Sequence, residues 1–215
     1  MYARPEDLPQ VIPVFPLDGA LLLPHASRPL NIFEPRYLNM LDDAMAAERV
    51  IGMVQTGAGG LPDRPALAPI GCAGRITSFS ETPDGRYLVT LTGLARFQVA
   101  DELPVQTPYR QVRADYARFQ ADLAPLSEAS GPERPRLTDA LRRYLEHRGM
   151  RIDWQAVEAA PVEPLVNSLA MALPFDPAEQ QALLEAGGLD ARREALITLL
   201  EIDGASYEEP PQQRQ

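Results

Sequence analysis

Hydrophobic and polar positions divide the chain into two halves with different periods. Up to about residue 120, apolar residues come in short runs or alternate with polar ones, which indicates strands. From about Pro135 onward they recur every three or four residues, as in helices that bury one face. We therefore expect an α+β protein with a β-rich half over residues 10–120, a helical half over 132–203 and a polar, disordered tail over 204–215.

Residues 11–41 predict two or three strands that lead into a helix. The run at 11–15 is apolar apart from Pro13, and its prolines predict an edge strand or a bent one. Further apolar runs follow at 21–23 and 30–33.

Two arginines, Arg28 and Arg36, and the carboxylate of Glu34 accompany these strands. Pro35 is placed to open a helix that ends near residue 48. Glu34, just before it, could accept hydrogen bonds from the free N–H groups of that helix. Arg36 and Arg96 are expected to hold strands together through bidentate hydrogen bonds. We assign Glu34, Arg36, Tyr37 and Arg96 to a structural motif.

Further strands and a hairpin are expected in the rest of the first half. The Gly- and Pro-rich residues 56–69 predict a loop, and Gly93 predicts a bulge. Pro83–Gly85 predicts the turn of a hairpin. The predicted strands lie at residues 50–54, 70–79, 87–94 and 110–116. About six strands in one half favour a closed or nearly closed β architecture.

The second half predicts a bundle of short helices. Asp176, Pro177 and Glu179 form a helix start with a capping box, and Gly149 is a typical helix end. Residues 122–135, rich in Pro, Ser, Glu and Ala, predict a hinge, whereas residues 1–9 predict a flexible lead-in. The predicted helices begin near residues 135, 154, 162, 177 and 190, the last one capped by Asp190.

Three segments carry a resemblance to a known family. They are FPLDGALLLPHASRPLNIFEPRY, IGCAGRITSF and PDGRYLVTLTGLARFQV, in this order along the chain. The chain resembles the N-terminal, substrate-binding domain of Lon proteases in its stand-alone form. The resemblance implies a PUA-like β pseudo-barrel followed by a helical subdomain, and recognition of proteins or peptides. Full-length Lon enzymes also carry an ATPase and a Ser–Lys protease module, and we expect neither here.

Composition narrows the function further. The 20 basic residues are all arginine, which excludes a P-loop and a Ser–Lys dyad. The net charge of −10 makes nucleic-acid binding unfavourable. One cysteine, no secretory signal and no long apolar run predict a cytoplasmic protein that has no membrane span. We expect no metal and no cofactor.

One nucleophile–base pair can be named, Cys72 with His25, but we expect a structural role for both. Cys72 falls on the apolar face of a strand, where a free cysteine behaves as a small buried hydrophobe. His25 follows a proline in a predicted turn. We therefore predict no catalytic residue and a protein that is not an enzyme.

The leading hypothesis is a recognition module for unfolded or hydrophobic segments of other proteins. An extended peptide would pair with a strand edge, and a groove between the two halves would take its side chains. Cooperation with a separate protease and a homodimer stay open. The alternative is a PUA-like protein that binds a small molecule or a nucleic acid. The predicted peptide-binding residues are Leu22, Pro24, His25, Ile32 and Phe33, with the apolar ones exposed.

Overall fold

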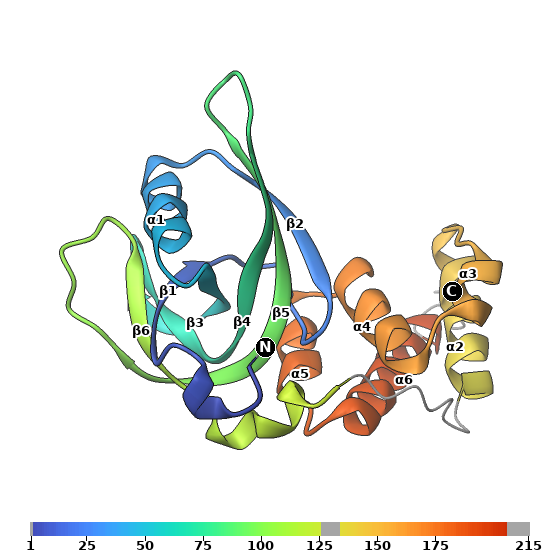
Figure 1. The fold of residues 1–215 in the computed structure, drawn as a ribbon. Helices are drawn as coiled ribbons and strands as arrows, with labels where there is room; N and C mark the ends of the chain where they lie inside the picture. The colour runs from blue at the N-terminus through green and yellow to red at the C-terminus, as the bar shows by residue number, and fades with distance from the viewer. Residues whose placement is uncertain (1, 126–133, 206–215) are drawn as a thin grey trace, which may run out of the picture.

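Strands fill the first half of the chain and helices the second, as the sequence predicts. The computed structural model describes residues 2–125 and 134–205. Figure 1 shows the strands, together with the helix at Pro35–Ala46, on one side and the helices of the second half on the other. The predicted hinge lies partly outside the described residues, and so does the tail from residue 206.

Six strands form one mixed sheet in the order β2-β5-β4-β3-β1-β6. The β1–β3 pair is parallel and the other pairs are antiparallel. β6 pairs with β1 and also with β5, so the strand pairing closes on itself and leaves β2 outside the closed part. The strands are β1 (Val11–Pro16), β2 (Ser27–Ile32), β3 (Val50–Leu61), β4 (Arg64–Glu81), β5 (Tyr87–Glu102) and β6 (Arg110–Asp115).

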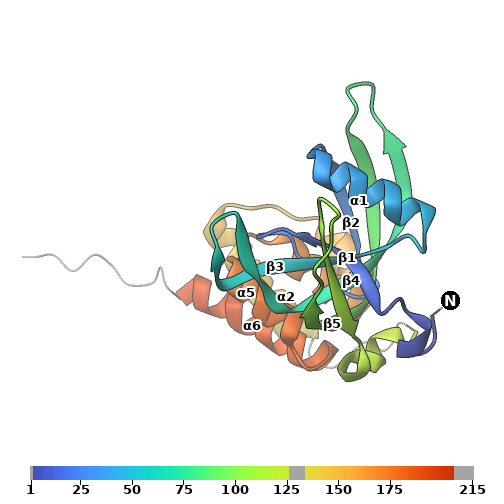
Figure 2. The ribbon, with the colours of Figure 1, turned by 90° about the vertical axis from the view of Figure 1, so that its left-hand side faces the viewer.

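The hairpin predicted between residues 70 and 94 is confirmed. It turns at Gly85, whose φ is 78°, and its far end rises beyond α1 (Pro35–Ala46) in both views (Figures 1 and 2). The register shifts between the Ala73–Ala95 and Gly74–Gly93 pairs, which places the expected bulge beside Gly93.

The loop predicted over residues 56–69 is wrong, because β3 and β4 continue through it as a second hairpin. Register shifts on both sides of Thr56 absorb its irregular sequence. A side chain on Gly60 would meet the Ala66 nitrogen at 2.4 Å, so glycine there permits the close approach of the two strands. The glycines of this segment predicted a loop, but in the structure they allow two strands to pair closely.

Two further expectations near the N-terminus are contradicted. Of the two alternatives for the first strand, edge or bent, the edge position is wrong, since β1 pairs with both β3 and β6. Pro13 is paired in register with β6 but not with β3, and Pro16 is paired with β3 but not with β6. Each proline therefore has one side without a registered partner, where its missing N–H is tolerated. The lead-in is not a free segment either, because a 3₁₀ turn at Pro5–Asp7 (η1) brings Leu8 into the core.

The helical half follows the predicted pattern closely. Asp176 and Glu179 form the predicted capping box, and Gly149 takes the predicted left-handed conformation, with φ of 61°. Asp190 is not the cap of the last helix, which begins one residue earlier. After the 3₁₀ segment η2 (Ala117–Leu123), the helices are α2 (Arg134–Arg148), α3 (Trp154–Ala159), α4 (Val162–Ala172), α5 (Pro177–Glu185) and α6 (Leu189–Ala205).

Of two buried apolar clusters, one lies within the strand half and the other is shared by the two halves. Buried side chains from the sheet, such as Ile51, Cys72 and Leu91, belong to the same contiguous cluster as Leu141 and Val166 of the helices. Burial of this kind is the main favourable term in folding, so the helices are part of the same packed structure as the sheet. The predicted domain limits stay predictions.

Candidate functional site

A turn at residues 23–26 brings the start of β2 against the helical half. His25 N–H donates to the Gly93 carbonyl at 2.9 Å, and Gly93 N–H donates to the Ala26 carbonyl at 2.9 Å. A side chain on Gly93 would meet the Leu23 carbonyl oxygen at 2.1 Å, so glycine is required where the turn crosses β5. His25 itself adopts a φ of 62°, which is uncommon for a residue other than glycine.

Two polar contacts join this turn and the start of β2 to α4. The Asn167 amide donates to the Pro24 carbonyl at 3.0 Å. Arg28 donates through Nε to the Leu21 carbonyl at 3.0 Å and through Nη2 to the Met171 carbonyl at 3.3 Å. Met171 lies in the last turn of α4, where carbonyl groups lack helical partners and a cation is favourable.

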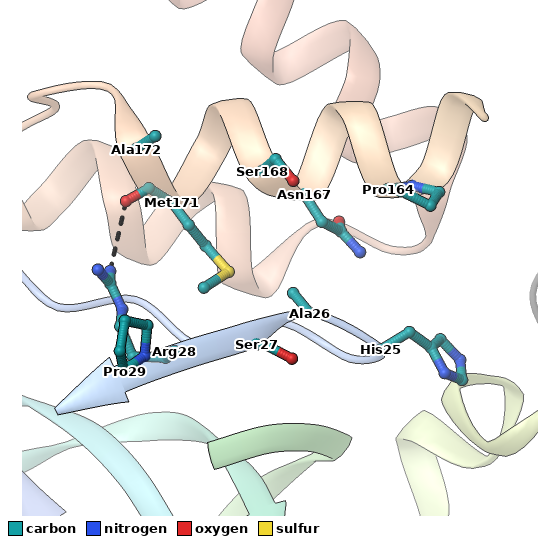
Figure 3. Close-up of a pocket in the computed structure, with 10 residues that line it drawn as sticks. All are labelled: His25, Ala26, Ser27, Arg28, Pro29, Pro164, Asn167, Ser168, Met171 and Ala172. Atoms are coloured by element: carbon teal, nitrogen blue, oxygen red, sulfur yellow. Dashed lines mark hydrogen bonds between the residues drawn. The ribbon is translucent and has the colours of Figure 1, made fainter. Parts of the chain in front are cut away.

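A pocket of about 330 Å³ lies between the 25–29 segment and α4. Figure 3 shows α4 along one wall and the start of β2 along the other, with the Met171 side chain reaching into the space between them. β2 pairs only with β5 among the described strands, so the pocket borders an edge strand. The lining residues are His25, Ala26, Ser27, Arg28, Pro29, Pro164, Asn167, Ser168, Met171 and Ala172.

A half-buried arginine, Arg28, lines the pocket, and a fully buried one, Arg192, lies behind it. Partial burial lowers the pKa of Arg28. Arg192 donates through Nη1 to Asn167 Oδ1 at 3.1 Å and through Nε to the Leu183 carbonyl at 3.0 Å. Its burial, followed by repulsion from Arg96, lowers the pKa of Arg192 to about 10. This side of the junction therefore carries positive charge in a chain whose net charge is −10.

The predicted peptide-binding residues separate into buried and accessible ones. Leu22 and Ile32 are 1% and 4% exposed, and Pro24 is buried as well, so the expected exposure of these residues is wrong. Leu22 and Ile32 belong to the apolar cluster shared by sheet and helices. His25 lines the pocket, and Phe33, just after β2, is 61% exposed. Their role in binding stays a prediction.

The Glu34–Arg36 pair lies on the surface and acts locally. Arg36 Nε donates to Glu34 Oε2 at 3.0 Å, and the Arg36 guanidinium lies 4.5 Å from the centre of the Tyr37 ring. The Glu34 side chain makes no capping bond to α1. The pair therefore does not tie strands together, whereas the Tyr37 ring does reach the core, packed edge-on against Phe15.

Arg96 holds the sheet to the helical half rather than strand to strand. It donates through Nε and Nη2 to the Asp122 carboxylate at 2.8 and 2.7 Å, and through Nη1 to the Leu184 carbonyl at 3.0 Å and to the Ala186 carbonyl. Sequence reasoning assigned Asp122 to a hinge and did not consider Asn167 or Arg192 at all. A buried asparagine on the apolar face of a predicted helix was the available sign for Asn167.

Cys72 and His25 do not form a nucleophile–base pair. Cys72 is 1% exposed, as predicted, and burial raises the pKa of its thiol well above the usual range, which disfavours the reactive thiolate. His25 lines the pocket, whereas the Cys72 thiol donates to the Ala73 carbonyl. Among residues 2–125 and 134–205, no cluster of His, Cys, Asp and Glu could hold a metal ion. None of the described helices combines the length and the apolar character needed to cross a bilayer.

Comparison with known proteins places the fold. Residues 11–201 match the family described as the ATP-dependent protease La (LON) substrate-binding domain. The chain belongs to this family. A solved structure of a Lon N-terminal domain protein from Xanthomonas campestris covers 87% of this chain and 97% of its own at 25% identity, with a TM-score of 0.61. The N-terminal domain of Mycobacterium avium complex Lon protease shares the fold, with a TM-score of 0.59 at 18% identity.

Curated relatives are much longer than this chain. Lon protease from Roseiflexus castenholzii is 29% identical over 92% of this chain, and Lon protease 2 from Myxococcus xanthus is 28% identical over 91%. The aligned part is 25% and 24% of those proteins. The chain thus spans about a quarter of their length, and its likeness is to the substrate-binding part.

Proposed function

We propose that this chain is a recognition module that binds extended segments of other proteins along the outer side of β2. The observation that carries the proposal is the pocket between this edge strand and α4. Membership of the Lon substrate-binding family supports protein segments as the ligand. The alternative, a small molecule or a nucleic acid, has no comparable support, and the acidic charge of the chain opposes nucleic acid.

Side-chain contacts supply most of the binding in this proposal. Pro29 sits within β2 and has no N–H to offer, so a continuous ladder of main-chain hydrogen bonds with an added strand is interrupted there. The pocket has room for one or two side chains of a bound segment, and Phe33 offers an exposed aromatic face at the far end of β2. Apolar side chains of an unfolded protein gain free energy on covering such a face.

The proposal has three associated parts. The closed pairing of β1, β3, β4, β5 and β6 corresponds to the PUA-like pseudo-barrel, a view supported by the double pairing of β6. The free thiol of Cys72 supports a reducing, cytoplasmic setting. Bound segments would be passed to a protease, in keeping with the similarity to Lon proteases. In this proposal the chain binds protein segments and catalyses no reaction itself. A homodimer stays a separate prediction.

Filling the pocket tests the proposal. Ala172 lines it and is exposed at the end of α4, so Ala172→Trp would occupy the space with little effect on the core. Ala178→Trp, at an exposed position in α5, is the matched control. Binding of a fluorescent, alkylated and unfolded model protein, measured by anisotropy, should weaken about tenfold, a loss of about 1.4 kcal/mol, with Ala172→Trp alone. Equal affinity in both variants would exclude the pocket.

The exposed aromatic end can be tested in the same assay. Phe33→Ser should weaken binding severalfold because it removes apolar contact area. Leu61, 65% exposed at the end of the β3–β4 hairpin, provides the control Leu61→Ser. A loss of the same size in both variants would indicate nonspecific adhesion to surface hydrophobes and would count against a site along β2.

A further inference from the structure

The charge of the β2–α4 pocket restricts what it can accept. Of its ten lining residues, Arg28 is the one with a permanent charge, and none of the ten is Asp or Glu. Acidic residues outnumber basic ones by 30 to 20 in the chain as a whole. A cationic pocket in such a chain differs from the average surface and favours an anionic group.

Arg28 is held in place with one amino group to spare. The Leu21 and Met171 carbonyls fix its Nε and Nη2, so the guanidinium is ordered before any ligand arrives. Nη1 has no hydrogen-bond partner among the described residues, and it is not one of the enclosed unpaired atoms. An ordered and partly desolvated guanidinium with a free N–H edge is a good donor to a carboxylate.

A second cation stands behind the pocket. Asn167, one of the lining residues, accepts a hydrogen bond from Arg192, which is 3% exposed. The nearby carboxylate of Asp122 is already engaged by Arg96, and Glu163 acts on Arg192 more weakly than Asp122 does. Arg28 and Arg192 are thus the cations at and behind the pocket, and no carboxylate belongs to its lining.

We propose that the β2–α4 pocket binds a carboxylate of the recognised protein segment, received by the free amino group of Arg28. This inference rests on the proposed function and adds the chemical class of the group bound. A carboxylate can come from the C-terminus of a chain or from an Asp or Glu side chain. The experiment below tests each source with its own pair of peptides.

A charge series at Ser168 tests the inference without disturbing the arginines. Ser168 lines the pocket, is exposed, and makes no side-chain hydrogen bond to the described residues. The variants are Ser168→Glu, Ser168→Arg and the neutral, size-matched Ser168→Gln. The probes are fluorescent ten-residue peptides of Val and Thr ending in Ala, with a free C-terminal carboxylate or a carboxamide. A second pair carries one internal Glu or Gln and ends in a carboxamide.

The inference predicts that at least one carboxylate peptide binds more tightly than its neutral partner. Relative to Ser168→Gln, Ser168→Glu should reduce this preference roughly fivefold at low salt, and Ser168→Arg should increase it. High salt should diminish all these differences. The arm that shows the preference identifies the source of the carboxylate.

Two results would overturn the inference. Equal affinity for carboxylate and neutral peptides would show that the pocket does not recognise a carboxylate, while the proposed binding of protein segments would still stand. A carboxylate preference that is unaffected by the charge at residue 168 would place the anion elsewhere. Failure of every peptide and of the unfolded model protein to bind would instead refute the proposed function, and this inference with it.

Discussion

Two arginines of the sheet dock on helix ends in the other half, and only one of them borders a pocket. Arg96 and Arg28 both donate to carbonyl groups at helix C-termini, Arg96 at the end of α5 and Arg28 at the end of α4. Arg96 is 3% exposed and its ion pair with Asp122 is buried. Arg28 has no carboxylate partner among the described residues, retains an unpaired amino group, and lines a space of about 330 Å³.

This difference distinguishes a structural contact from a site that can bind. A guanidinium whose donors are all used inside the fold has nothing left for a ligand, and its removal is felt by the fold. A guanidinium fixed by carbonyl groups, with one edge open, costs the fold less and can recognise an anion. Residue type and local position are the same at both junctions, so the number of partners decides the role.

The largest effect is expected from breaking the closed junction. Arg96→Leu leaves the Asp122 carboxylate buried without its partner, which should lower the free energy of unfolding by about 3–5 kcal/mol. Urea unfolding followed by circular dichroism measures the change. Arg36→Leu is the control, since Arg36 and its partner Glu34 are about half exposed, and it should cost under about 1 kcal/mol. A similar loss of unfolding free energy in Arg96→Leu and Arg36→Leu would contradict the distinction between buried and exposed arginines.

An intermediate effect is expected at Asn167, the polar link between the 23–26 turn and the buried Arg192. Asn167→Ala removes the donor to the Pro24 carbonyl and the acceptor of Arg192, leaving buried polar groups unpaired. The free energy of unfolding should fall by about 2 kcal/mol. Ser168→Ala, at the exposed neighbouring position, should be within about 0.5 kcal/mol of the parent in the same measurement. An unchanged free energy of unfolding in Asn167→Ala would mean that the 23–26 turn does not depend on its contact with α4.

The smallest effect on stability, with the clearest effect on binding, is expected at the open junction. Arg28→Gln retains a donor but loses the charge at the end of α4, at a cost of about 1 kcal/mol. The preference for a carboxylate peptide over its neutral partner should disappear in the anisotropy assay. If Arg28→Gln destabilised the protein as much as Arg96→Leu and kept the preference, the roles assigned to the two arginines would have to be exchanged.

Local order along the chain was predictable, and the pairing of distant segments was not. The Asp176–Glu179 capping box and the 70–94 hairpin depend on neighbouring residues, and both are confirmed. Glycines near residue 60 predicted a loop because their composition is the same whether they form a loop or permit close strand pairing. Local sequence carries little information on where a strand meets a distant helix.

The candidate site depended on such a meeting. Arg28 and Met171, like Pro24 and Asn167, are 143 residues apart in sequence. Sequence reasoning placed the binding residues in the correct stretch, but it assumed that an apolar run such as Leu21–Leu23 is exposed. In the structure those leucines build the core, and the polar groups beside them form the pocket.

The most direct test of the pocket as the recognition site is methyl NMR on methionine. The chain has six methionines; Met171 lines the β2–α4 pocket, whereas Met150 lines a different pocket between α2 and α3. Protein labelled with ¹³C at the methionine methyl groups would be titrated with the tightest-binding peptide, with signals assigned through Met171→Leu and Met150→Leu. The account predicts that the Met171 signal shifts with peptide concentration while the Met150 signal stays in place. A shift of Met150 with Met171 unchanged would contradict it.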